Sequence, residues 1–168
     1  MATFTLVHVL LSLVGIGSGL LVVVGLLNSK DFDRWTQVFL ATTLLTSVTG
    51  FFFPFHGFTP GIGVGILSII ILAIAIVARY IRRLAGAWRK GYVVTAVMAL
   101  YFNVFVLVVQ LFEKVPALQA MAPTQTELPF AATQIVVLAL FVGLGVQATR
   151  RFHSAHPPTA RAAAGGTR

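Results

Sequence analysis

Cysteine is absent from this chain of 168 residues, and charged residues make up only 10% of it. Without cysteine there is no disulfide framework, no thiolate nucleophile and no cysteine-based metal site. Soluble domains carry about a quarter charged residues, whereas 58% of this chain is hydrophobic and its mean hydropathy is +0.94. A soluble fold of this size cannot bury so much apolar surface, so the composition predicts an integral membrane protein.

The few charged residues are gathered in short segments, with long uncharged stretches between them. The charged segments are 30–34, 79–90, 113–127 and 150–168. One helix needs about 20 apolar residues to cross ~30 Å of hydrocarbon. The 44 uncharged residues from Trp35 to Ala78 suffice for two crossings. The sequence FFFPFHGFTP, residues 51–60, supplies the proline and glycine that a turn between them requires.

We therefore predict an all-α integral membrane bundle of five transmembrane helices. The predicted spans are about 4–27, 35–54, 61–79, 91–112 and 129–149. The first span lacks a basic leading segment and a small-residue cleavage site, so we predict a retained helix and no signal peptide. Residues 151–168, rich in Ala, Pro, Gly and Arg, are predicted to form a disordered basic cytoplasmic tail.

The positions of the basic residues predict the orientation. With five spans, 11 of the 12 Lys and Arg residues lie on one side, and only Lys114 lies on the other. The positive-inside rule then places the N-terminus outside and the C-terminus in the cytoplasm of a bacterial inner membrane. A four-span alternative segregates the charge less well. Anionic lipid headgroups, and not nucleic acid, are the expected partners of Arg79, Arg82, Arg83, Arg89 and Lys90.

Small residues four apart mark two predicted helix contacts. Gly15 and Gly19 form one pair in the first span, and Gly61 and Gly65 form another at the start of the third. Such pairs let helix backbones approach closely in lipid. Packing within one bundle is the favoured interpretation, and the alternative is the seam of a homo-oligomer.

Polar side chains inside the spans are the next candidates. Thr42, Thr46 and Thr49 share one face of the second span. A polar path along this face is one interpretation, and the favoured one is that these hydroxyls bond back to their own helix or to a neighbouring helix. The fourth span carries Tyr101, Asn103 and Gln110, of which Asn103 needs a protein partner.

Two histidines are the candidates for chemistry. His8 lies near the outer end of the first span, and His56 lies in the predicted outer turn. Imidazole pairs ligate b-type haem and metals, so His8 and His56 are a candidate cofactor pair. Their different depths and the lack of a nearby carboxylate favour ordinary hydrogen bonding, with no cofactor and no metal.

No Asp, Glu, Lys or Arg is predicted inside any span, and no hydrolase, zinc-protease or phosphate-loop motif occurs. The sequence therefore leans against an enzyme. It favours a non-enzymatic accessory, assembly or helix-packing component. A small transporter or channel using the threonine face and Asn103 is the first alternative, and a haem-binding redox protein is the second.

The segment AGAWRKGYVVTAVMALYFNVFVLVVQLFEKVPAL, residues 85–118, and the earlier TSVTGFFFP carry a resemblance. Together they resemble a family of small multi-span inner-membrane proteins of Proteobacteria, over about half of the chain. The resemblance implies a bacterial inner-membrane location and no particular reaction.

Overall fold

A computed structural model describes residues 2–53 and 60–153, and this part of the chain is helical without strands. The helices are α1 (Ala2–Leu27), α2 (Asp33–Gly50), α3 (Pro60–Ile76), the π-helical turn η1 (Val77–Ile81), α4 (Ala87–Lys114), α5 (Pro116–Met121) and α6 (Leu128–Arg151). The prediction of an all-α protein is confirmed for these residues.

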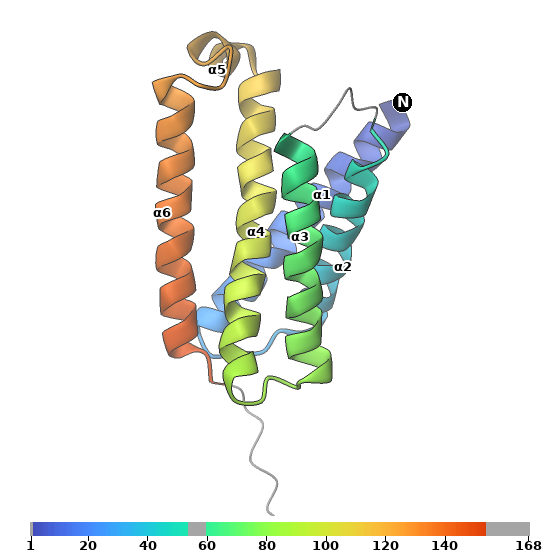
Figure 1. Cartoon of the computed structure of the whole chain (residues 1–168), viewed down its shortest axis with the longest axis vertical. Coiled ribbons are helices and arrows are strands. Elements are labelled where there is room, and N and C mark those ends of the chain that lie inside the picture. The colour runs from blue at the N-terminus through green and yellow to red at the C-terminus, as the bar shows by residue number, and fades with distance from the viewer. Residues whose placement is uncertain (1, 54–59, 154–168) are drawn as a thin grey trace, which may run out of the picture.

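The five long helices run alternately up and down (Figure 1). One end of the bundle carries the start of α1 and the short helix α5, and we call it the outer end. The opposite, inner end carries the α1–α2 connection, the turn between η1 and α4, and the end of α6. All the predicted basic segments that the structure describes therefore meet at one end.

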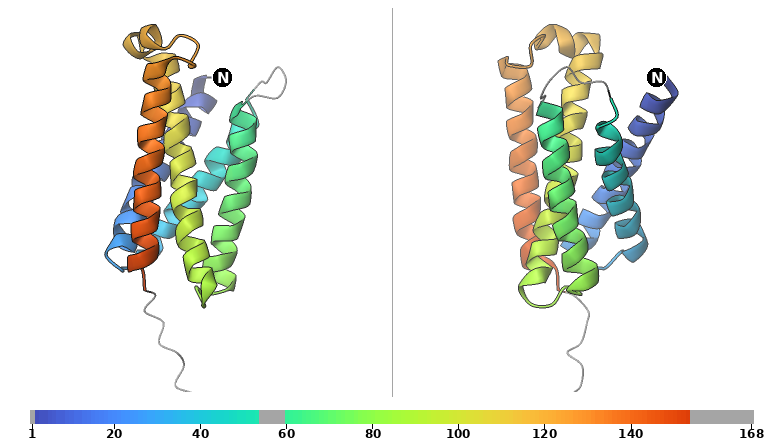
Figure 2. Two further views of the ribbon diagram at one scale, coloured as in Figure 1. Left: turned by 60° about the vertical axis from the view of Figure 1, so that its left-hand side comes forward. Right: turned by 45° about the vertical axis from the view of Figure 1, so that its right-hand side comes forward.

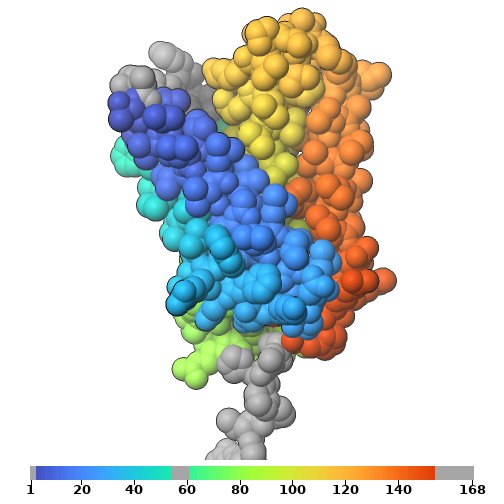
Figure 3. Space-filling view, turned by 180° about the vertical axis from the view of Figure 1, so that it is seen from behind, coloured from blue at the N-terminus to red at the C-terminus, as the bar shows by residue number. Residues whose placement is uncertain are grey.

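Helix α4 is central, because it contacts α1, α3, α5 and α6. Helix α1 runs obliquely across the face of the bundle seen in Figure 3, where it lies in front of α4 and reaches the lower part of α6. The core is richest near the inner half, where Phe39, Leu72, Tyr92 and Leu100 are almost completely buried. Helix α6 stands at the side of the bundle (Figure 2), and only Phe141 and Ala148 are buried on it.

Four of the described helices are long and apolar enough to cross a membrane: Thr3–Leu27, Gly61–Ile81, Ala87–Lys114 and Leu128–Arg151. These helices are compatible with a multi-pass membrane protein. Helix α2 does not qualify, because its sequence includes Asp33, Arg34 and several threonines. It nevertheless packs beside α1 along much of its length (Figure 1).

The observed helices differ from the predicted spans mainly at their ends. Helix α2 begins at Asp33 and ends at Gly50, earlier than the predicted end at 54. Helix α4 begins at Ala87 because Gly86, with φ of 55°, ends the preceding turn. Residues 54–59, which include most of the predicted turn, and residues 154–168 of the disordered tail predicted for 151–168 lie outside the described residues.

Candidate functional site

A buried arginine is the most unusual feature of the inner end. Arg79 lies in η1, and its side chain is only 5% exposed. Its Nη2 atom donates to Asp31 Oδ1 at 2.6 Å and to Asp33 Oδ1 at 2.5 Å. The guanidinium carbon also lies 5.1 Å from the ring centre of Tyr92, within the range of a cation–π contact. We call Asp31, Asp33, Thr36, Arg79 and Tyr92 the inner cluster.

Helical spacing places this arginine on the buried face of its span, because Leu72 and Ala75, seven and four residues before it, are also buried. A π-helical turn then ends the span. A π-turn inserts an extra residue into a helix and rotates the residues that follow. Here Arg82 N–H donates to Val77 O, five residues back, at 2.8 Å. The chain then reverses through Arg83 and Leu84, whose φ angles are 49° and 57°. Two successive left-handed residues other than glycine are unfavourable, so the ion pairs and core contacts must stabilise this turn.

The inner cluster closes the inner ends of three helices against one another. Tyr92 on α4 and Thr36 on α2 are both buried, and their hydroxyl oxygens lie 3.4 Å apart, which is long for a hydrogen bond. Asp31 and Asp33 bring the α1–α2 connection against η1. The Nε and Nη1 atoms of Arg79 are buried and make no hydrogen bond among the described residues. The cluster therefore has donor capacity that its two carboxylates do not use.

Sequence reasoning missed this site. It placed Arg79 with four other basic residues facing lipid headgroups and predicted no charged residue inside a span. The structure places the Arg79 side chain within the bundle, at the end of the span Gly61–Ile81. Asp31 and Asp33 are the feature of the sequence that could have indicated this site. They are half of the acidic residues of the chain, and they lie on the same predicted side of the membrane as Arg79.

Asn103 has the protein partner that a buried amide requires. Its Nδ2 atom donates to Thr43 Oγ1 at 3.0 Å, which joins α4 to α2. Gly15 on α1 lies against the same two side chains, because a Cβ built at Gly15 would be 3.2 Å from Thr43 Oγ1 and 3.3 Å from Asn103 Nδ2. The small residue thus allows α1 to approach the polar contact between α2 and α4.

The three threonines of the predicted polar face have different partners. Thr42 and Thr49 donate to the carbonyl oxygens of Val38 and Leu45, both at 2.7 Å, so these hydroxyls bond back to their own helix. The Thr46 hydroxyl is buried without a hydrogen-bond partner among the described residues.

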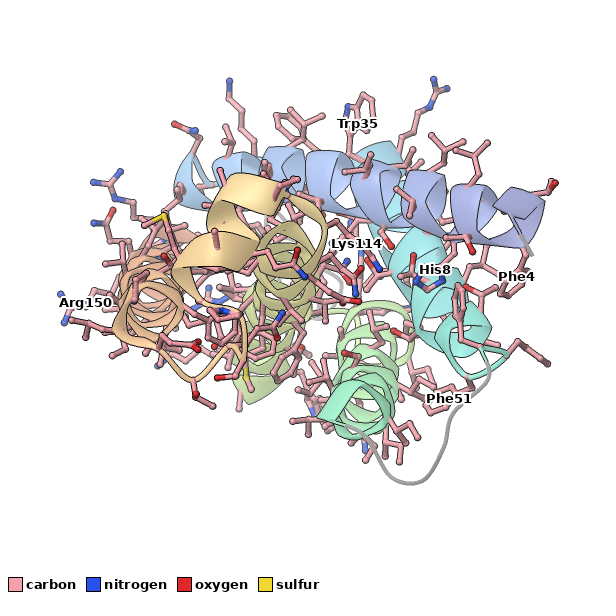
Figure 4. All side chains as sticks on the ribbon, turned by 90° about the horizontal axis from the view of Figure 1, so that it is seen from above. Phe4, His8, Trp35, Phe51, Lys114 and Arg150 are labelled. Atoms are coloured by element: carbon pink, nitrogen blue, oxygen red, sulfur yellow. The ribbon has the colours of Figure 1, made fainter. Side chains whose placement is uncertain are left out.

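His8 is the outermost of four polar side chains between α1, α2 and α4, and we call His8, Thr49, Thr43 and Asn103 the polar row. Its Nδ1 atom lies 2.8 Å from Thr49 Oγ1, and its ring meets Phe53 edge-on at 5.1 Å. Seen from the outer end, His8 lies between α1 and α2 (Figure 4). The predicted partner, His56, lies outside the described residues, so the pair stays a prediction.

An apolar layer separates the polar row from the inner cluster. Phe39 and Leu100 are both buried, and both lie against Gly19, where an added Cβ would be 2.8 Å from Phe39 Cε2 and 2.7 Å from Leu100 Cδ1. The contacts of Gly19 are therefore within the bundle.

The remaining predicted residues lie apart from these clusters. Gly65 lies against the ring of Phe51, at 3.0 Å from a built Cβ, and Figure 4 shows Phe51 beside α3. Gly61 is exposed at the start of α3. Tyr101 packs against Phe141 on α6 with ring centres 5.8 Å apart, and Gln110 is exposed near Glu113.

No group of three or more metal-ligating side chains is found within residues 2–53 and 60–153. Comparison with models of protein families, with curated proteins and with solved structures finds no match to this chain. The resemblance to Proteobacterial inner-membrane proteins accordingly stays a prediction.

Proposed function

We propose that the protein is a five-crossing component of a bacterial inner membrane with a non-enzymatic role in assembly or helix packing. Its N-terminus is outside, and its C-terminus is cytoplasmic. Helix α2 makes the fifth crossing: its 18 residues rise about 27 Å, close to the ~30 Å of the hydrocarbon layer. Its interior polar residues are compatible with lipid because other helices cover them.

The polar contacts between helices support a packing role. His8 joins α1 to α2, Asn103 joins α4 to α2, and Arg79 joins η1 to the start of α2. On α6, Gln134 Nε2 donates to Phe105 O on α4 at 3.2 Å. Each of the five long helices is thus held to a neighbour by a polar bond, and in lipid such bonds fix which faces meet.

One observation carries the proposal: α6 leaves most of its apolar surface uncovered. Val136 and Leu140 are 67% and 58% exposed. In lipid, helices associate through close packing and not through hydrophobic drive. We propose that the free side of α6 meets a further membrane helix, from a second copy or from another protein, because α6 is the least covered of the four long apolar helices.

Photo-crosslinking in intact membranes tests this proposal. A photoreactive amino acid at Leu140 should give one discrete protein adduct, from a second copy or a partner. The control is Ile70 on α3, which is 52% exposed and should give lipid adducts only. Equal, diffuse labelling from both positions would contradict a packing role for α6.

A transport function is the second candidate, and the buried Thr46 hydroxyl favours it. Thr46 lies on α2 between Thr43 and Thr49, so the three hydroxyls form a row, with one member free to bind a polar solute. Phe39 and Leu100 would have to move for a solute to pass. Flux in liposomes that Thr46→Val and Asn103→Leu both abolish would support this function, and flux insensitive to both would remove it.

Haem binding at His8 and His56 is a separate proposal. The Thr49 hydroxyl occupies His8 Nδ1 and leaves Nε2 as the nitrogen suited to ligation. An absorption spectrum of protein prepared with haem tests it: a Soret band lost in His8→Ala would support it, and no Soret band would dispose of it.

A further inference from the structure

Helices α4 and α6 enclose an apolar groove of about 590 Å³ on one flank of their contact. Its wall on α4 includes Val97, Met98 and Phe102, and its wall on α6 includes Leu138, Val142 and Val146. Tyr101 and Phe141, whose rings pack together, contribute to the lining where the two helices meet. The groove is thus formed by the packing of these two helices.

Apart from Tyr101, the polar residues of the groove are confined to its inner end. Thr149 and Arg150 lie there, and the Thr149 hydroxyl already donates to Gly145 O at 2.7 Å. Arg150 is exposed, and none of the ion pairs among the described residues includes it. Viewed along the bundle, its side chain extends from α6 at the edge of the molecule (Figure 4). The groove therefore combines an apolar trough with one free cation at its mouth.

The length of the groove matches one leaflet of a bilayer. From Leu138 to Thr149 the helix rises about 16 Å, roughly half of the ~30 Å hydrocarbon thickness. On the outer side of Leu138 the space between α4 and α6 is filled by Phe112 and Phe130, whose rings pack edge-to-face with centres 5.4 Å apart. An acyl chain occupies one leaflet and so matches the groove along its whole length, whereas a transmembrane helix of a second copy would extend beyond the groove into the other leaflet.

We propose that this groove binds one anionic phospholipid of the leaflet at the inner end. An acyl chain lies between α4 and α6, and the phosphate accepts hydrogen bonds from the Arg150 guanidinium. Arginine suits this position because its planar fork binds phosphate oxygens in pairs. The proposal rests on the proposed membrane location, but it does not depend on the partner proposed for the other face of α6.

Lipid retention measured by native mass spectrometry tests the proposal. The full chain is reconstituted in vesicles of equal parts phosphatidylglycerol and phosphatidylcholine, extracted in mild detergent and sprayed. Wild type should retain one phospholipid per chain, preferentially phosphatidylglycerol. Arg150→Gln should reduce the preference for phosphatidylglycerol roughly fivefold, the order expected for one basic residue at an anionic surface. The neighbouring Arg151→Gln is the matched control and should leave the preference unchanged.

Filling the groove gives an independent readout. Val142→Phe places a larger side chain on the groove wall, and Val136→Phe makes the same change on the free face of α6. Both valines are exposed, so both variants should fold and unfold at similar temperatures. Only Val142→Phe should lose the retained lipid.

Equal effects of Arg150→Gln and Arg151→Gln, or lipid retained by Val142→Phe, would overturn the proposal. So would a dimer that only Val142→Phe dissociates, because the occupant would then be a second copy. Failure of the proposed membrane location would be distinct: wild type would remain soluble without detergent.

Discussion

Arg79 is the residue on which the inner end of the bundle depends. The double substitution Asp31→Asn and Asp33→Asn removes both its carboxylate partners and leaves a buried guanidinium uncompensated. We expect a loss of roughly 1–3 kcal/mol in the free energy of unfolding. This is less than for a fully buried pair, because the two carboxylates are 44% and 70% exposed. Thermal unfolding of wild type and the double variant in detergent measures this loss of stability.

The matched control for this prediction is Arg34→Gln, an exposed charge close to the same connection. It should change stability little. Adding Arg79→Met to the double variant should recover part of the loss, because an apolar side chain no longer needs a carboxylate. If Arg34→Gln costs as much as the double variant, the inner cluster does not have the role described here.

Glu127 precedes α6 and orders the outer connection. Its carboxylate accepts hydrogen bonds from Thr124 Oγ1 at 2.8 Å, Thr124 N at 3.1 Å and Thr126 N at 3.0 Å. Desolvation is the largest single influence and raises the pKa of Glu127, but the hydrogen bonds from Thr124 and Thr126 together outweigh it and hold the pKa below its ordinary value.

A lowered folded-state pKa means that this ordering is fully present above the unfolded-state pKa and is lost as the pH falls through the folded one. Amide resonances of Thr124 and Thr126 should therefore titrate together, below the ordinary pKa of a glutamate. Glu127→Gln should abolish the titration, whereas Glu113→Gln should leave it. Titration at or above the ordinary value would contradict these hydrogen bonds.

At the scale of the element, α1 owes its close approach to its glycines. A side chain at Gly19 would collide with Phe39 and Leu100, whereas a Cβ at Gly17 meets nothing within 4 Å. Gly19→Leu should destabilise the bundle by about 1–3 kcal/mol, as overpacking does in cores. Gly17→Leu makes the same change two residues away and should be neutral or slightly stabilising, because glycine is a poor helix former. Equal unfolding temperatures for the two variants would contradict the observed packing of α1.

The helices were largely predictable from the sequence, because uncharged runs of about 20 residues separate short charged segments. The two features that the sequence left open depend on rotation about a helix axis. Arg79 shares the buried face of its span with Leu72 and Ala75, and a run of hydrophobic residues does not report which face of a span is buried. The groove between α4 and α6 depends likewise on which flanks of the two helices meet, and composition does not encode that.

Candidate site residues could be predicted from the sequence, but their partners could not, because the partners depend on which helix faces meet. The need of Asn103 for a protein partner follows from chemistry alone, but its partner Thr43 was not singled out, because threonine is common in α2. Thr42 and Thr49 bond to carbonyl oxygens of their own helix, as the favoured interpretation has it, whereas the contact of Thr49 with His8 depends on how α1 and α2 pack.

For the whole molecule, the central claim is that the chain crosses the membrane five times, with α2 among the crossings. Because the natural sequence contains no cysteine, a single introduced cysteine reports the side on which it lies. Ser29, Ala85 and Gln119 are exposed positions in the α1–α2 connection, the turn before α4, and α5.

The decisive measurement is labelling of Ser29→Cys, Ala85→Cys and Gln119→Cys with a membrane-impermeant maleimide, in intact and in permeabilised cells. Five crossings with the N-terminus outside predict that Gln119→Cys is labelled in intact cells. Ser29→Cys and Ala85→Cys should both be labelled only after permeabilisation. Labelling of Ser29→Cys and Ala85→Cys from opposite sides would show that α2 does not cross, and would contradict the account.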